Sequence, residues 1–242
     1  MGVSRRAGLG LLAATFAGAA WPAVTQDPAE RVSVGTYPSS GEPITVVVFS
    51  PPEPGLPMEG AAILLLHGGG GAGLDLSRWY DHAVRLAGRG YIVAYPAWFG
   101  ANEGGQGAGA LQRQAVLDGA AWLTTVPGVD PARIAAVGFS RGGYMASEVA
   151  VSDANIAAVV SIASGGSRRP DQIRRRPPTL LIYADADPVV APAQTRAWER
   201  TLEAADVPVE TLVLDSPRHV FEPLEWRRIF DEAHRFLRRT LT

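Results

Sequence analysis

The run "AAILLLH" at residues 61–67 has only apolar side chains before its final histidine. A short run of this kind, with turn residues on both sides, is typical of a strand that is buried on both faces. Parallel strands acquire this burial because the helices that connect them cover both faces of the sheet. The run "RVSVGTY" at 31–37 instead alternates between apolar and polar residues, as an edge strand does. Together the two runs predict an open, mostly parallel sheet.

Short β-branched runs alternate with longer amphipathic stretches along the rest of the chain, which is the pattern of an α/β fold. The 242 residues, of which 47% are hydrophobic and 19% charged, suit one domain with a sizeable core. We therefore expect a doubly wound, mostly parallel, eight-stranded sheet flanked by helices. The expected strands lie at about 31–37, 44–50, 62–66, 91–95, 133–138, 156–162, 179–184 and 209–214, and the expected helices at about 75–88, 110–125, 141–151, 192–205 and 223–239.

Residues 1–25 have the pattern of a signal peptide, because "SRRAGLGLLAATFAGAA" places paired arginines before an apolar run that ends in small residues. The run is shorter than the roughly 20 apolar residues that cross a bilayer, which argues against a retained membrane helix. The adjacent arginines resemble a shortened twin-arginine export signal. We expect cleavage near Ala19 or Ala20, export to the periplasm or the medium, and one domain over 26–242. The alternatives are an uncleaved anchor and a disordered leader.

Composition excludes several classes of function. The formal charge of −2 gives no overall electrostatic attraction to nucleic acid or to an anionic membrane, so neither a nucleic acid partner nor stable membrane insertion is expected. The absence of cysteine removes disulfides, thiolate metal sites and a cysteine nucleophile. Every basic residue is arginine, and a phosphate-binding P-loop needs a lysine. A small-molecule substrate is the expected partner.

The motif "VGFSRGGYM" places Ser140 between an expected strand and an expected helix. In a strand-turn-helix elbow of the G-x-S-x-G type, the glycines beside the serine relieve crowding, and its hydroxyl projects above the edge of the sheet. Gly138 and Gly142 occupy these two positions. Since ligands of open parallel sheets bind beyond the carboxyl ends of the strands, Ser140 is the candidate nucleophile.

A serine nucleophile needs a base, and the chain has four histidines: His67, His82, His219 and His234. His219 is the best placed, because it lies in the loop "SPRHVFEP" after the last expected strand. His82 and His234 lie inside amphipathic helical patterns, which predicts surface or core-edge positions, and His67 ends the third strand.

The third group must orient the imidazole and stabilise its charged form, which a carboxylate in the loop after the seventh expected strand would do. The stretch "LLIYADADPVVAP" offers Asp185 and Asp187. The turn-forming Asp-Pro step favours Asp187 at the crest of the loop, and the sequence alone leaves Asp185 open. The order Ser140, Asp187, His219 is the chain order expected of an α/β-hydrolase triad.

The stretch "LLLHGGGGAG" follows the third expected strand and suits an oxyanion hole. Acyl transfer builds negative charge on a carbonyl oxygen, and glycine allows backbone N–H groups to approach that oxygen closely. We expect one donor from Gly69 or Gly70 and the other from Arg141, the residue after the candidate nucleophile.

The segments "LLLHGGGG", "VGFSRGG", "DADPVV" and "RHVF" occur in this order. With them the chain, from about residue 31, resembles the α/β-hydrolase superfamily and most closely its dienelactone hydrolase-like branch. The resemblance implies a serine esterase mechanism that uses Ser140, His219 and Asp187 and needs no cofactor or metal. It also implies acyl transfer from a carboxylic ester through an acyl-enzyme. The founding dienelactone hydrolases use a cysteine nucleophile, which this chain lacks. The alternatives are an exported serine peptidase or amidase, and a non-catalytic binding protein on the same fold.

Two further segments bear on the substrate. The stretch "ASGGSRRPDQIRRRPP" stands where many relatives insert a helical cap, and its length predicts little or no cap. Its arginines between Arg168 and Arg176 either attract an anionic substrate or belong to a solvated loop. Trp98 and Phe99 follow the fourth expected strand, where they form an aromatic wall for the acyl group or pack at the edge of the core.

Overall fold

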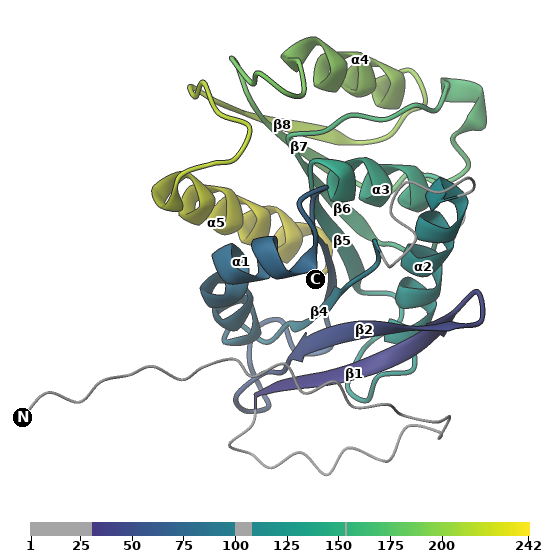
Figure 1. Cartoon of the computed structure of the whole chain (residues 1–242), viewed down its shortest axis with the longest axis vertical. Coiled ribbons are helices and arrows are strands. Elements are labelled where there is room, and N and C mark those ends of the chain that lie inside the picture. Colours follow the sequence, from purple (N-terminus) through teal and green to yellow (C-terminus); the bar gives the residue numbers. More distant parts are fainter. Residues whose placement is uncertain (1–30, 100–107, 153) are drawn as a thin grey trace, which may run out of the picture. The chain divides into compact units, whose positions relative to one another are not determined.

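A computed structural model describes residues 31–99, 108–152 and 154–242 of the chain. The expected signal peptide lies outside the described residues. Figure 1 shows a twisted central sheet with helices on both of its faces.

The sheet has eight strands in the order β1-β2-β4-β3-β5-β6-β7-β8. β1 pairs with β2 and β2 with β4 in antiparallel register, and every later neighbour is parallel. This confirms the predicted mostly parallel sheet, with the alternating strand β1 at one edge and β8 at the other. The strands are β1 (Val32–Ser39), β2 (Glu42–Phe49), β3 (Ala62–Leu66), β4 (Ile92–Pro96), β5 (Ile134–Phe139), β6 (Ala158–Ile162), β7 (Thr179–Ala184) and β8 (Val209–Leu214).

Within the described residues four α-helices lie between strands and a fifth follows β8, and all five were predicted. They are α1 (Ala72–Ala87), α2 (Ala108–Leu123), α3 (Arg141–Ala150), α4 (Pro192–Glu203) and α5 (Pro223–Thr240). α1 begins three residues before the predicted start at 75, because Gly71 supplies the N-cap with a φ of 89°. A short 3₁₀ helix, η1 (Pro170–Gln172), lies between β6 and β7.

The side chains of β3 show why its sequence lacks polar alternation. Ile63 and Leu65 pack in the core layer that contains α1 and α5, whereas Leu64 and Leu66 pack in the layer that contains α2 and α3. Figure 1 shows these helix pairs on opposite sides of the sheet. Because successive side chains of a strand point to opposite faces, a strand covered on both faces must be apolar throughout.

The connection from β6 to β7 contains no helix other than η1. This confirms the prediction of little or no cap at this position. Among the described residues, no helix is both long and apolar enough to cross a membrane.

Candidate active site

Ser140 lies in a sharp turn between the end of β5 and the start of α3. Its backbone has a φ of 51° and a ψ of −119°, a conformation that non-glycine residues seldom adopt and that costs of order 1–3 kcal/mol. The turn is held on both sides, because the Ser140 N–H donates to Ile162 O at 2.7 Å and its carbonyl accepts from Tyr144 N at 3.0 Å. A strained serine fixed in this way is the elbow that the sequence predicted.

The two glycines beside Ser140 are required by the close packing of the elbow. A Cβ atom on Gly138 would lie 2.2 Å from Gly142 O, and a Cβ atom on Gly142 would lie 2.3 Å from Leu66 O and 2.5 Å from His67 O. Real Cβ atoms do not approach oxygen so closely, so only glycine fits at either position. The predicted role of these glycines is confirmed.

His219 connects the serine to a buried carboxylate. Its Nε2 lies 2.9 Å from Ser140 Oγ, and its Nδ1 lies 2.8 Å from Asp187 Oδ2. The His219 side chain is 12% exposed and the Asp187 side chain is fully buried. The ring of Phe139 packs beside the imidazole, with 5.1 Å between ring centroids. The structure thus brings together the three residues that the sequence selected.

The two candidate acids have different surroundings. Asp187 accepts three hydrogen bonds, because its Oδ1 also receives the N–H groups of Val189 at 2.8 Å and Val190 at 2.9 Å. Asp185 is exposed, and its Oδ1 accepts the N–H of Ser216 at 3.1 Å. The geometry therefore places Asp187, and not Asp185, against His219.

The other three histidines lie elsewhere in the fold. His67 is buried at the end of β3, with its Nδ1 at 2.9 Å from Gly68 O. His82 stacks on Phe230 at 4.5 Å between ring centroids, and His234 Nδ1 lies 3.1 Å from the Tyr91 hydroxyl. The last two positions agree with the prediction of core-edge residues.

The glycine loop, residues 67–71, lies between β3 and α1. The N–H of Gly68 donates to Asp75 Oδ2 at 2.7 Å, and the N–H of Gly71 donates to Gly68 O at 3.2 Å. Gly69 and Gly70 are exposed, and their N–H groups donate to no other described residue. These are the two glycines that the sequence proposed for the oxyanion hole.

Arg141 opens α3, so its N–H belongs to the first turn, which has no acceptor within the helix. Its side chain extends away from the backbone: Cζ lies 4.4 Å from the centre of the Phe99 ring, and Nη2 donates to Gln112 Oε1 at 3.2 Å. Phe99 and its neighbour Trp98 are buried in the layer beside α2. These two aromatic residues therefore pack in the core, and Phe99 also contacts the residue that follows the candidate nucleophile.

Tyr144 is a neighbour of the site that the sequence analysis missed. Its hydroxyl donates to Gln194 Oε1 at 2.5 Å. Burial, and secondly the negative charge of Asp187, raise the pKa of Tyr144, so this hydroxyl stays protonated. The signal available in the sequence was its place in the first turn of the helix that follows Ser140.

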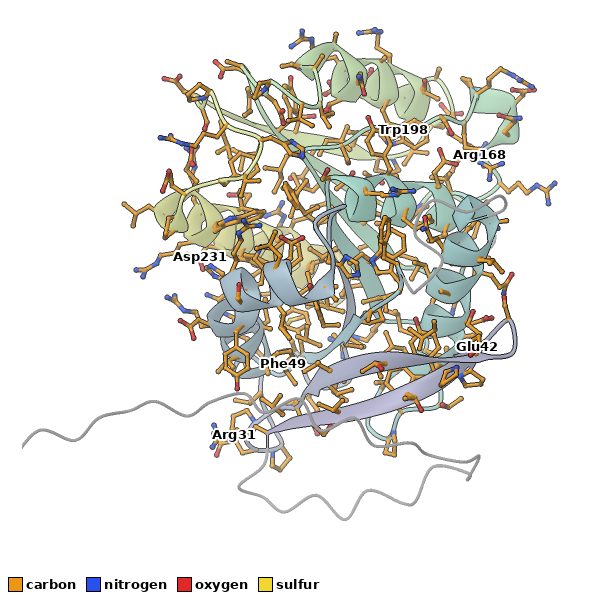
Figure 2. All side chains as sticks on the ribbon, in the orientation of Figure 1. Arg31, Glu42, Phe49, Arg168, Trp198 and Asp231 are labelled. Carbon is orange, nitrogen blue, oxygen red and sulfur yellow. The ribbon has the colours of Figure 1, made fainter. Side chains whose placement is uncertain are left out.

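The arginines between 168 and 176 are mostly bonded within their own loop and its neighbours. Arg168 pairs with Glu148 at 2.7 Å, Arg169 with Asp171 at 3.2 Å, and Arg176 donates to Ala205 O at 2.6 Å. Figure 2 shows Arg168 beside the ribbon of η1. This arrangement supports a structured surface loop. Among the described residues, no cluster of three or more His, Cys, Asp or Glu side chains suits a metal ion.

Comparisons with known proteins agree with this fold. A "Putative esterase NocK" from Nocardia uniformis subsp. tsuyamanensis is 32% identical over 168 residues, which are 61% of this chain and 48% of NocK. The chain thus spans about half the length of this curated relative.

Two solved structures share the architecture. The dienelactone hydrolase-like promiscuous phosphotriesterase P91, from metagenomic libraries, has a TM-score of 0.70 at 18% identity over 87% of this chain and 98% of its own. Pyrococcus horikoshii acylaminoacyl peptidase has a TM-score of 0.69 at 16% identity over 87% of this chain and 41% of its own. Likeness at such low identity concerns the fold alone.

The family model of the dienelactone hydrolase family matches residues 44–224, from β2 to the first residues of α5. This span includes the elbow, the glycine loop and the loops that carry Asp187 and His219. The chain belongs to the dienelactone hydrolase family.

Proposed function

We propose that the protein is a serine esterase that cleaves a carboxylic ester through an acyl-enzyme. The observation that carries the proposal is the continuous chain of hydrogen bonds from Ser140 Oγ through His219 to Asp187, with distances of 2.9 and 2.8 Å. Nucleophile, base and orienting acid within hydrogen-bond reach form the arrangement that activates a serine hydroxyl.

In the proposed reaction, Ser140 Oγ attacks the ester carbonyl carbon while its proton passes to His219 Nε2. The tetrahedral intermediate then collapses, the ester C–O bond breaks, and Nε2 returns the proton to the departing alcohol. Water repeats the sequence on the acyl-enzyme: it gives its proton to Nε2, and Ser140 Oγ recovers that proton as the acid leaves. Asp187 accepts from His219 Nδ1, which keeps Nε2 free to act as the base and stabilises the imidazolium.

The oxyanion of each tetrahedral intermediate would lie between the Arg141 N–H and an N–H of Gly69 or Gly70. Support for this assignment comes from hydrogen bonds that engage the other two N–H groups of the glycine run, those of Gly68 and Gly71. Removing one such donor typically lowers kcat by about 10² to 10³.

An ester is favoured over a peptide because the relative NocK carries the name of an esterase. The short connection from β6 to β7 leaves this side of the site without a cap, which suits small or exposed esters. A serine peptidase or amidase would use the same residues. Because a peptidase has a similar fold, the test below also includes peptide substrates.

The test is hydrolysis of para-nitrophenyl acetate and butyrate, beside peptide anilides, by the wild type and by Ser140→Ala at equal folded content. We expect turnover of the esters by the wild type and a fall of several orders of magnitude in Ser140→Ala. Turnover of anilides in preference to esters would indicate the peptidase. Equal activity of the two proteins would refute the role of Ser140, and equal inactivity would favour a binding protein on this fold.

A further inference from the structure

Asp75 is a buried carboxylate that the proposed reaction does not use. It lies in the first turn of α1 and is 1% exposed. Its Oδ2 accepts the N–H of Gly68 at 2.7 Å, and its Oδ1 accepts Arg78 Nη1 at 2.9 Å. A charge so well buried is tolerated only because both oxygens are bonded.

The simplest explanation of an acid at this point is the helix dipole, since acidic residues are favourable in the first turn of a helix. The dipole explains the charge of Asp75 but not its direction, because an exposed carboxylate would satisfy it equally well. Asp75 instead turns inward and reaches back seven residues to the glycine loop. The N-cap, Gly71, has no side chain and therefore gives α1 no capping bond.

Gly68 is held between Asp75 and the elbow. A Cβ atom on Gly68 would lie 2.9 Å from Phe139 Cδ1 and 3.3 Å from Asp75 Oδ2. Phe139 is the residue before Ser140, so Gly68 packs against the elbow while its N–H is bonded to α1. The start of the glycine loop therefore has a fixed distance to Ser140.

The same bond fixes a peptide plane. Because peptide units are planar, the bond to the N–H of Gly68 sets the orientation of the His67–Gly68 unit, and the bond to Gly68 O sets that of the next unit, which carries the N–H of Gly69. Glycine has no side chain to restrict this path, so a bond to a neighbouring element is needed to make it unique. The bond from Gly71 N to Gly68 O closes the loop on the other side.

We propose that Asp75 is a positioning residue of the oxyanion hole, which holds the glycine loop so that the N–H of Gly69 or Gly70 faces the carbonyl oxygen of an ester bound at Ser140. This inference rests on the proposed esterase function. Asp75 touches neither substrate nor triad in this scheme and acts only through the backbone of the loop.

The exchange Asp75→Asn keeps the shape of the side chain but leaves one acceptor oxygen for two donors, the N–H of Gly68 and the guanidinium of Arg78. The oxygen turns to the charged guanidinium, and the NH₂ group then faces the N–H of Gly68, so the bond that holds the loop is lost. Donors of an oxyanion hole act chiefly in the transition state, so kcat should fall by about 10- to 100-fold, a part of the loss caused by removing a donor, while KM stays within about twofold. Butylboronic acid forms a tetrahedral anionic adduct with an activated serine, and its inhibition constant should rise by about the same factor as kcat falls.

Two variants separate positioning from stability. Asp81→Asn removes the same charge from an exposed site on α1 and should leave both readouts unchanged. Arg78→Met removes the counter-charge but keeps the bond from Asp75 to Gly68, so it should lower the melting temperature while kcat per titrated active site stays within about threefold. All rates are divided by the number of active sites titrated to completion with a fluorophosphonate, which removes the contribution of misfolded protein.

The outcomes are distinct. A parallel loss of kcat and boronic acid affinity in Asp75→Asn alone supports the inference. Unchanged kcat and boronic acid affinity per active site in Asp75→Asn, beside a wild type that binds the inhibitor, overturn it and leave the esterase proposal intact. A rise in KM without loss of kcat also overturns it. A wild type that neither binds boronic acid nor hydrolyses esters overturns the proposed function and this inference with it.

Discussion

The exchange of Asp187 for asparagine is the sharpest test of the proposed triad. In the native site, Oδ1 accepts two backbone N–H groups and Oδ2 accepts from His219. The amide oxygen of asparagine would keep the two backbone bonds, and its NH₂ group would then point at His219 Nδ1. An NH₂ group donates, so Nδ1 must become the acceptor and the ring proton must move to Nε2.

That tautomer blocks the reaction, because a protonated Nε2 cannot take the proton of Ser140. The expected loss is about 10⁴ in kcat, which corresponds to about 5 kcal/mol in the activation barrier. Stability should change little, since every native hydrogen-bond position is still filled. We expect a melting temperature close to that of the wild type and the loss of nearly all hydrolysis of para-nitrophenyl butyrate, measured per folded protein.

The matched control is Asp185→Asn, two residues away in the same loop. Its carboxylate accepts a single backbone N–H, from Ser216, and an amide oxygen accepts that bond equally well. We expect full activity in this variant. A loss of less than about tenfold in Asp187→Asn, or an equal loss in Asp185→Asn, would contradict the assignment of the acid.

Three further predictions concern the elbow, acid stability and the leader. Gly142→Ala puts a methyl group 2.3 Å from Leu66 O, so the elbow must shift by about 1 Å and kcat should fall by about 10² in ester hydrolysis. Burial lowers the pKa of His234, beside Tyr91, from 6.5 to about 4, so the unfolded chain takes up a proton first as the pH falls. The free energy of unfolding therefore keeps its full contribution from His234 above pH 6.5 and loses it as the pH falls toward 4. In thermal melts, the fall in melting temperature from pH 7 to pH 5 should be smaller in His234→Gln than in the wild type. Residues 1–25 are proposed to be a signal peptide, and N-terminal sequencing of protein from the periplasm or medium should find them removed.

Each of these predictions has a control. Gly109→Ala adds a methyl group that meets no described atom within 4 Å outside its own helix backbone and chain neighbours, so it should leave activity unchanged. A similar loss in both variants would contradict the steric argument. An equal fall in melting temperature from pH 7 to pH 5 in the wild type and in His234→Gln would show that groups other than His234 determine the loss of stability in acid. An exchange of the paired arginines of the leader for glutamines should leave the chain inside the cell, and continued export would refute the signal.

Much of the fold was predictable because the spacing of apolar residues along the sequence differs between buried strands, edge strands and helices. β3 and β7 have the predicted bounds, since continuous burial on both faces demands an unbroken apolar run. The start of α1 was placed too late, at the first acidic residue of the pattern. The actual start follows Gly71, whose positive φ depends on the path of the glycine loop and leaves no mark in the hydrophobic period.

The site was predictable to the extent that its residues follow strand ends. Ser140, Asp187 and His219 each lie in a turn or loop beyond the carboxyl end of a parallel strand, so topology alone brings them to one edge of the sheet. Asp75 could not be found in this way. In the sequence it is an ordinary acid near the start of an expected helix. It gains a backbone partner only because the glycine loop folds back onto α1 in the tertiary structure.

Phe139 shows why some substitutions near the elbow change rate and stability together, whereas others change the rate alone. Its ring packs against Trp79 and Trp226 of the core, at 6.0 and 5.2 Å between ring centroids, and also against His219 of the site. Its backbone leads directly into Ser140. A smaller residue at 139 would therefore leave a cavity in the core and release the imidazole at the same time, and neither effect could be measured alone. Asp187 and Asp75 can each be exchanged for an amide of the same shape, which changes a hydrogen bond but leaves no cavity, so at these two positions a loss of rate can be separated from a loss of stability.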